Sequence, residues 1–160
     1  MPTGHRVENK KPLPPGEVVL VDVDGVLSDA SGRQYHLDGP KKDWLSFFEA
    51  SVDDPPIMEG VRLVAQLAAK HPVVLVTARP GRLADLTINW MERHGVRWDL
   101  LAMRTDGDHG ASFEVKRRIL AGLRADGYQP TLAIDDEAKN LAMYRSEGVP
   151  TVYVHSGYYQ

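Results

Sequence analysis

Two aspartates, Asp22 and Asp24, come at the end of a strongly apolar run near the start of the chain, and Gly25 follows them directly. The run Val18–Val23 is typical of a buried strand in a parallel sheet. Open α/β sheets place their ligand sites at the carboxyl ends of such strands. Two carboxylates there can hold a divalent cation, and one of them can attack an electrophilic centre such as phosphorus.

Further polar residues occupy comparable places later in the chain. They are Thr77 at the end of a second apolar run, Lys116 in the first turn of a helix whose start is marked by Ser112, and the pair Asp135 and Asp136 at the end of a fourth run. This set suits phosphoryl transfer, in which carboxylates attack phosphorus, handle a proton and hold a cation, while a hydroxyl and an ammonium bind phosphoryl oxygens. Each feature alone also fits a turn, a solvated helix face or a helix cap. The order in which all of them follow one another along the chain favours a catalytic role over these structural ones.

These residues need a fold that brings the ends of several strands together. Apolar runs predict five strands, at Val18–Val23, Pro72–Val76, Trp98–Met103, Thr131–Ile134 and Thr151–Val154. Amphipathic stretches between them predict helices near residues 59–71, 82–94, 113–126 and 137–147. Strands that alternate with helices are typical of a three-layer α/β/α Rossmann-like sandwich around a parallel sheet.

Two segments fall outside this alternation. Residues 1–16 are rich in proline and basic side chains, and we expect a flexible N-terminal tail there, with a single domain over residues 17–160. The polar stretch Ser28–Ile57 interrupts the first crossover, and Lys42–Ala50 within it predicts a short helix. An insertion at this point would lie over the carboxyl edge of the sheet as a small flap, and it is too short for a large cap.

Composition excludes several classes of protein. The chain has 160 residues, a formal net charge of −3 and no cysteine, which excludes disulfides, thiolate metal sites and cysteine nucleophiles. It has neither an apolar run long enough to span a membrane nor a signal-peptide pattern, so we expect a cytoplasmic protein without a membrane partner. Binding to a nucleic acid would need a local basic patch and a bound cation.

The order of the motifs resembles that of the haloacid dehalogenase (HAD) superfamily of aspartate-nucleophile phosphohydrolases, over nearly everything after residue 16. The resemblance implies a five-stranded parallel sheet of order 5-4-1-2-3, with a small flap and no large cap. It implies that Asp22 is the nucleophile that forms an aspartyl-phosphate and that Asp24 is the general acid and base. It also implies that Thr77 and Lys116 bind phosphate.

The same resemblance implies Mg²⁺ as the cofactor, held by Asp22, the backbone carbonyl of Asp24 and the pair Asp135 and Asp136. Which member of that pair contacts the metal directly stays open. An acid at the position of Asp24 is found in most phosphohydrolases of the superfamily and is missing from dehalogenases and phosphonatases, which favours phosphate esters. Val26 stands where many members have threonine.

A narrower resemblance is to the 3′-phosphatase domain of phage polynucleotide kinase/phosphatase. The shared segments are Asp22-Val-Asp24-Gly, Gly32-Arg33, Thr77-Ala-Arg79, Gly107-Asp108, Ala133-Ile-Asp135-Asp136 and Val154-His-Ser156-Gly157-Tyr158. By this match, Arg33 and Arg79 grip the phosphate or the adjacent nucleic-acid backbone, although Arg33 equally fits a surface charge of the flap. The chain departs from these relatives in lacking a GxxxxGK[ST] kinase loop and in having few charges over residues 109–112.

We therefore predict a Mg²⁺-dependent phosphatase that removes 3′-phosphates from polynucleotide ends, alongside a separate kinase or ligase. One alternative is a phosphatase that acts on a small metabolite or nucleotide. Another is a non-catalytic partner protein with the same fold, which the filled catalytic positions disfavour. The sequence leaves open the choice between DNA and RNA, activity on cyclic phosphates and the oligomeric state.

Overall fold

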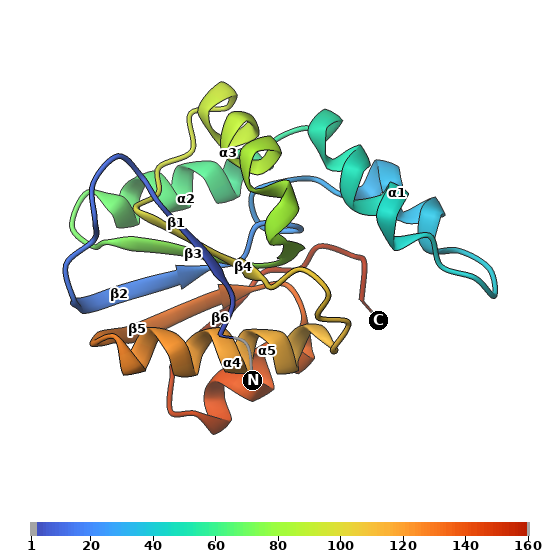
Figure 1. The fold of residues 1–160 in the computed structure, drawn as a ribbon. Coiled ribbons are helices and arrows are strands. Elements are labelled where there is room, and N and C mark those ends of the chain that lie inside the picture. Colours follow the sequence, from blue (N-terminus) through green and yellow to red (C-terminus); the bar gives the residue numbers. More distant parts are fainter. Residues whose placement is uncertain (1–2, 160) are drawn as a thin grey trace.

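Alternating apolar residues in strand β2 (Gly16–Val21) explain the layers of the fold. Val18 and Leu20 belong to one buried cluster, and Val19 and Val21 belong to another. Because successive side chains of a strand point to opposite faces of the sheet, such a strand needs cover on both faces. The computed structural model describes residues 3–159 and shows helices on each side of the sheet (Figure 1).

The helices lie close to their predicted positions. Helices α2 (Met58–Ala68) and α3 (Ala84–Arg93), the latter preceded by the short turn η3 (Gly81–Leu83), cover one face, and α4 (Ser112–Ala125) and α5 (Ala138–Ser146) cover the other (Figure 1). No helix within residues 3–159 is long and apolar enough to cross a bilayer.

The start of α4 corrects one detail of the sequence reading. Ala111 is the N-cap, its side chain makes no capping bond, and Ser112 is the first helical residue. Lys116 is therefore the fifth residue of the helix, one residue further from its start than predicted.

Five strands of the sheet are parallel and follow the predicted order. The six strands are β1 (His5–Glu8), β2, β3 (Val73–Pro80), β4 (Leu100–Arg104), β5 (Tyr128–Asp135) and β6 (Thr151–Tyr153), in the order β1-β4-β3-β2-β5-β6. Without β1, this order read from β6 is the predicted 5-4-1-2-3, so the predicted fold class is confirmed. All carboxyl ends of the parallel strands share one edge of the sheet.

Strand β1 corrects the prediction of a flexible tail over residues 1–16. It pairs antiparallel with β4, and Val7 stands opposite Leu101 and packs against the core. The physical reason is that β4 would otherwise be an open edge, which β1 covers. Four residues among polar and proline-rich neighbours carry too weak a pattern to predict a strand. Residues 1–2, which the same prediction covers, lie outside the described residues.

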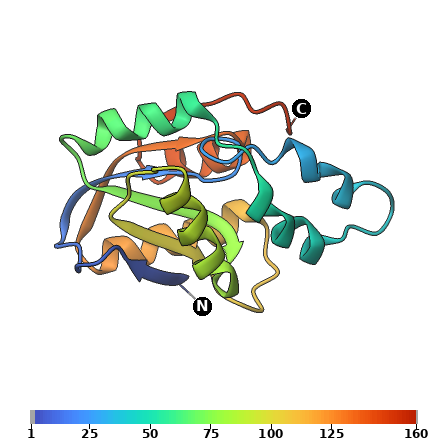
Figure 2. The same ribbon diagram turned by 90° about the horizontal axis from the view of Figure 1, so that it is seen from above.

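The insertion after β2 forms an arm at the carboxyl edge of the sheet (Figures 1 and 2). It consists of the 3-10 turn η1 (Ser31–Leu37), the helix α1 (Trp44–Glu49) and the turn η2 (Ala50–Asp53). Helix α1 lies within the predicted range 42–50. Its N-cap is Asp43, whose carboxylate accepts a hydrogen bond from the Ser46 backbone N–H at 3.1 Å.

Candidate active site

Three carboxylates converge at the carboxyl edge of the sheet. Asp22 follows β2, Asp135 ends β5, and the two strands are parallel neighbours with Val21 opposite Ile134. This register places Asp22 beside Asp135, and Asp136 comes next in the chain. One oxygen from each of the three aspartates lies within 4.8 Å of the other two, and all three residues are buried. The sheet thus brings together acids that lie far apart in the sequence.

The electrostatics of this cluster favour a bound cation. Burial and the neighbouring charge of Asp135 raise the pKa of Asp22 well above its ordinary value, against the opposing effect of a nearby lysine. Burial also raises the pKa of Asp136. Carboxylates that share a buried space in this way repel one another, and a divalent cation between them removes the repulsion.

The hydrogen bonds distinguish the two members of the acidic pair. Asp135 accepts bonds from Lys116 Nζ at 2.7 Å, from Asn140 Nδ2 at 3.2 Å and from the Glu137 backbone N–H at 3.0 Å. Asp136 Oδ2 is buried with no hydrogen-bond partner among the described residues. A buried, unpaired carboxylate oxygen within reach of Asp22 suits a hard cation such as Mg²⁺, so the residues present fit the implied metal.

Lys116 links two of the three carboxylates of the cluster. Its Nζ donates to Asp22 Oδ1 at 3.0 Å as well as to Asp135. Burial alone would lower the pKa of Lys116, but the charges of Asp135 and Asp22 outweigh it and raise the pKa. The ammonium therefore stays charged, as a group that binds phosphoryl oxygens must.

Asp24 lies between two guanidinium groups. Its Oδ1 accepts from Arg33 Nη2 at 2.5 Å and from Arg79 Nη2 at 2.6 Å, and its Oδ2 accepts from Arg79 Nε at 3.1 Å. Burial would raise the pKa of Asp24, but the charges of Arg79 and Arg33 prevail and bring it to about 2. Asp24 is thus ionised at neutral pH in the ligand-free protein, and its carboxylate is held in one orientation.

The two arginines differ from the sequence expectation in what they contact. The side chains of Arg33 and Arg79 are 2% and 0% exposed, and both bind Asp24. The alternative reading of Arg33 as a surface charge of the flap is therefore wrong. A direct contact of either arginine with phosphate stays a prediction.

Thr77 is buried within β3 instead of ending it, since the strand continues to Pro80. Its Oγ1 accepts a hydrogen bond from the Arg79 backbone N–H at 3.1 Å. That bond uses an oxygen lone pair and leaves the hydroxyl proton for another acceptor. Thr77 thus helps to shape the chain before Arg79, and its predicted bond to phosphate stays a prediction.

The loop after β2 depends on Gly25. Its φ is +87°, a conformation that side chains with a Cβ rarely adopt, and a Cβ built at this position would lie 2.0 Å from Asp136 Oδ2. The backbone at Gly25 therefore packs directly against the unpaired oxygen of the acidic cluster.

Sequence reasoning missed two polar residues that support the site. Asn140, in the first turn of α5, donates to Asp135, and its place just after the acidic pair is a signal that could have found it. Asp54 accepts bonds from Ser28 Oγ at 2.5 Å and from Arg33 Nε at 2.9 Å. No local pattern distinguishes Asp54 from the other acids of the polar insertion.

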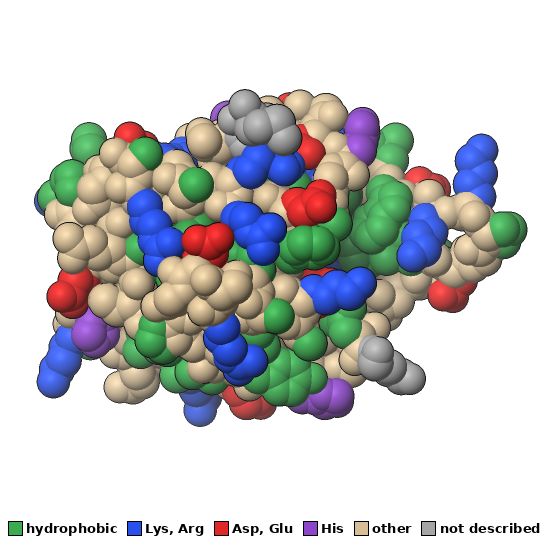
Figure 3. Space-filling model, turned by 90° about the horizontal axis from the view of Figure 1, so that it is seen from below, with side chains coloured by type: hydrophobic (Ala, Val, Ile, Leu, Met, Phe, Trp, Pro, Cys, Tyr) green, Lys and Arg blue, Asp and Glu red, His purple; other side chains and the backbone are tan. Residues whose placement is uncertain are grey.

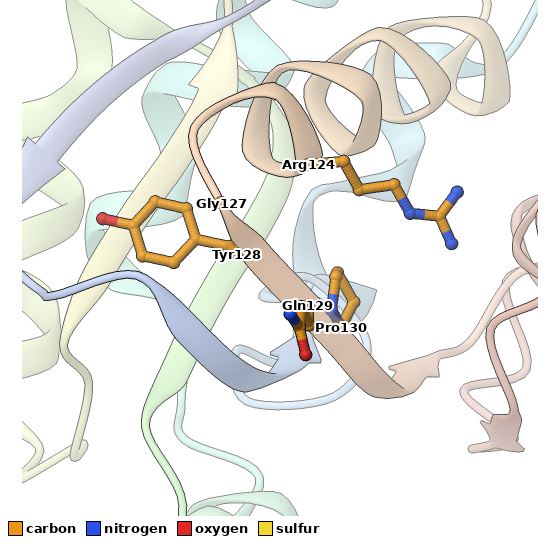
Figure 4. A pocket seen from close by; sticks show the side chains of 5 residues that line it. All are labelled: Arg124, Gly127, Tyr128, Gln129 and Pro130. Atoms are coloured by element: carbon orange, nitrogen blue, oxygen red, sulfur yellow. The ribbon is translucent and has the colours of Figure 1, made fainter.

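Two surface hollows differ in their relation to this site. A groove of about 440 Å³ includes Gly25 in its lining, together with residues of α2 and of the C-terminal segment 154–158, so it opens beside the carboxylates. A second pocket, of about 300 Å³, lies at the amino end of β5 (Figure 4) and is lined by Arg124, Gly127, Tyr128, Gln129 and Pro130. Because β5 is eight residues long, this pocket is roughly 20 Å from Asp135 and away from the chemistry.

A family model described as the polynucleotide kinase PNKP phosphatase domain matches residues 16–159. The chain belongs to this family. The HAD phosphatase fold predicted from the sequence is thereby confirmed, and the aspartates after β2 and β5 lie within the matched part of this PNKP-type phosphatase domain.

Solved structures share the fold of the domain. A chain of the Pnkp1/Rnl/Hen1 RNA repair complex superposes with a TM-score of 0.75 at 20% identity, over 94% of this chain and 46% of that chain. The class C acid phosphatase from Bacillus anthracis gives 0.65 at 15% identity, over 91% and 68%. A HAD family enzyme from Bacteroides thetaiotaomicron, solved with magnesium and inorganic phosphate, gives 0.50 at 16%, over 90% and 96%. The domain thus spans less than half of the repair-complex chain.

Proposed function

We propose that this PNKP-type domain is a Mg²⁺-dependent phosphatase that removes 3′-phosphates from polynucleotide ends through an aspartyl-phosphate intermediate. The observation that carries the proposal is the convergence of Asp22, Asp135 and Asp136, with Lys116 bound to Asp22 and Asp135. Family membership supports the phosphatase chemistry.

In the first step, a carboxylate oxygen of Asp22 attacks phosphorus and forms a new P–O bond. The bond between phosphorus and the ester oxygen breaks, and its electron pair stays on that oxygen. The negative charge of the bound phosphate opposes the effect of the two arginines, so Asp24 takes up a proton from solvent as the substrate binds. Its carboxyl group then delivers this proton to the departing alkoxide, while Lys116 and Thr77 bind the phosphoryl oxygens.

In the second step, a water molecule attacks phosphorus and displaces the Asp22 carboxylate, which releases inorganic phosphate. Asp24, now ionised, takes the proton of this water. Its two arginine contacts favour the ionised form that the base needs. Asp24 returns to its protonated state and Asp22 to its free carboxylate.

The side chains of Asp22 and Asp136 and the backbone carbonyl of Asp24 would hold Mg²⁺, with Asp135 fixed behind them by its own hydrogen bonds. When bound, the cation neutralises negative charge on the phosphoryl oxygens and on the carboxylates. This assignment makes Asp136, whose Oδ2 is unpaired, the direct ligand of the acidic pair.

The choice of a polynucleotide end as substrate rests on the family and on access to the site. The arm is small, so a polymer end can approach the edge of the sheet without displacing a cap domain (Figure 2). The face covered by α4 and α5 carries Lys and Arg side chains interspersed with Asp and Glu, without one dominant sign (Figure 3). This face therefore does not present a broad basic surface for nucleic acid.

The chain would work together with other enzymes that act on polynucleotide ends. The similar repair-complex structure contains Pnkp1, Rnl and Hen1. By analogy, a kinase or ligase that acts on the same ends would work with this chain, in the cytoplasm.

Phosphate release from two oligonucleotides of one sequence, phosphorylated at either the 3′ or the 5′ end, tests the proposal. We expect Mg²⁺-dependent release from the 3′-phosphorylated strand, little release from the 5′-phosphorylated strand, and none with Asp22→Asn or with chelator. Faster release from a sugar phosphate or a nucleoside monophosphate would replace the polynucleotide with a small metabolite as substrate. No release from any ester by the folded protein would overturn the enzymatic assignment and favour a binding role.

A further inference from the structure

Another buried carboxylate, that of Asp54, contacts the arginines that hold Asp24. Its side chain accepts from Arg33 Nε at 2.9 Å and from Arg33 Nη2 at 2.8 Å. The same Nη2 donates to Asp24 Oδ1, so one guanidinium bridges the two carboxylates. Arg79 Nη2 lies 3.8 Å from Asp54 Oδ2 and completes the group. Two guanidiniums and two carboxylates thus form one group, buried except for part of Asp24, and their formal charges cancel.

Asp54 is itself held from several elements. Ser28 Oγ, in the loop after β2, donates to Asp54 Oδ2 at 2.5 Å. The indole N–H of Trp90 on α3 donates to the Asp54 backbone carbonyl at 2.9 Å. These contacts anchor the carboxylate to the body of the domain, although it belongs to the insertion.

The arginines are fixed from the other side as well. Arg33 Nη1 donates to the Phe47 carbonyl at 3.1 Å, and its guanidinium carbon lies 4.4 Å from the centre of the Phe47 ring. Arg79 Nη1 donates to Thr87 Oγ1 at 3.1 Å. The two arginines are therefore held on several sides, and Asp54 shares with Asp24 the balancing of the charge of Arg33.

We propose that Asp54 is a positioning residue, which orients Arg33 and Arg79 so that they hold the Asp24 carboxyl group over the ester oxygen. This inference rests on the proposed function in one respect, the role of Asp24 as the group that protonates the leaving alkoxide. Replacing Asp54 by asparagine keeps the shape but turns an amide N–H₂ toward donors of Arg33 and Ser28. The guanidinium must then move, and Asp24 moves with it.

The test compares two esters that differ in their need for a proton. The alkoxide released from a 3′-phosphorylated oligonucleotide needs protonation by Asp24, whereas the weakly basic p-nitrophenolate released from p-nitrophenyl phosphate does not. The parameter to measure is kcat/KM, because it includes only the steps up to departure of the leaving group and leaves out hydrolysis of the aspartyl-phosphate. For Asp54→Asn, we expect a loss on the order of tenfold or more with the oligonucleotide and less than about twofold with p-nitrophenyl phosphate.

Two further variants make the result specific. Asp53→Asn changes the exposed neighbouring acid, and we expect it to leave both values unchanged. Ser28→Ala removes the bond to Asp54 and the weaker 3.4 Å bond that Ser28 Oγ accepts from Arg79 Nη2, with little change of shape, and it should give a smaller loss with the same selectivity. If Asp54→Asn does not fold, the Ser28→Ala variant tests the role of Asp54 in its place.

The outcomes separate this inference from the proposed function. Equal losses on both esters, in a variant with wild-type melting temperature, would show a general structural role for Asp54 and overturn the inference alone. An unchanged kcat/KM on both esters would overturn it too. A wild-type chain that hydrolyses neither ester would contradict the proposed function, and the role of Asp54 would fall with it.

Discussion

Asp22 is placed where its negative charge is unfavourable in the absence of a cation. Burial and the charge of Asp135 raise its pKa, and Lys116 compensates only in part. A buried group whose charged form is disfavoured makes the folded protein less stable at neutral pH than an uncharged group of the same shape would. The stability of the domain should therefore report directly on the occupancy of the metal site.

The variant Asp22→Asn tests this relation. In the presence of chelator, we expect it to melt no lower than the wild type, because it removes one of three mutually repelling carboxylates. Added Mg²⁺ should raise the melting temperature of the wild type and leave that of the variant nearly unchanged. An equal Mg²⁺-dependent shift in both proteins, measured by thermal denaturation, would place the metal elsewhere.

Asp24 differs from Asp22 in that its surroundings lower its pKa and favour its charged form. Its pKa is lowered from 3.8 to about 2, so its ionised form stabilises the fold at pH values above about 5, and this contribution is lost as the pH falls through 4 toward 2. The difference in the free energy of unfolding between the wild type and Asp24→Asn should therefore shrink by about 2 kcal/mol over this range. Urea denaturation in chelator at several pH values measures it. A constant difference would mean that the arginines do not hold Asp24 as described.

At the scale of residues, those proposed to bind the cation and the phosphate could be named from sequence. The aspartates and Thr77 lie at the ends of recognisable apolar runs, and Lys116 lies near the start of a predicted helix. Asp54 could not. It becomes important only through partners 21 and 26 residues away, Arg33 and Ser28, that meet it after folding. The bonds between Arg79 and Asp24 could not be predicted for the same reason. They form because the neighbouring strands β2 and β3 bring the two residues together on folding.

Among the elements, the loop that leaves β2 has the least freedom to change. It must turn at Gly25 with a positive φ while its backbone lies against Asp136. The arm that follows can vary more in its outer part, because its exposed residues include Tyr35 and Trp44. The loop and the arm therefore differ in how they tolerate substitution, although they are adjacent in the chain.

Gly25→Ala and Gly39→Ala form a matched pair for this comparison. Both glycines have nearly the same φ, +87° and +85°, but a Cβ at Gly39 would have no neighbour within 4 Å. Both variants should lose about 1 kcal/mol of stability from backbone strain. Only Gly25→Ala should also lose the Mg²⁺-dependent rise in melting temperature, because its methyl group displaces Asp136. Normal Mg²⁺ stabilisation of Gly25→Ala would show that Asp136 is not a metal ligand.

For the whole molecule, the order of the parallel strands could be predicted because it accompanies the motif order that identifies the superfamily. Strand β1 could not be predicted, because it forms by pairing with the open edge of β4 and its own four residues carry no clear strand pattern. The path of the arm was also beyond prediction, because it depends on buried ion pairs such as that between Arg33 and Asp54. The sequence thus predicts the parallel sheet that positions the aspartates, and it does not predict the pairing of β1 or the buried ion pairs of the arm.

The central claim is that Asp22, at the carboxyl edge of the sheet, is the nucleophile that attacks phosphorus. The most direct measurement is acid quenching of the wild-type chain during turnover of a 3′-phosphorylated oligonucleotide with Mg²⁺, followed by peptide mapping with mass spectrometry. We predict a phosphoryl group on the peptide that contains Asp22, located on that aspartate and absent when chelator replaces Mg²⁺. Turnover with the phosphoryl group on another residue would contradict the account.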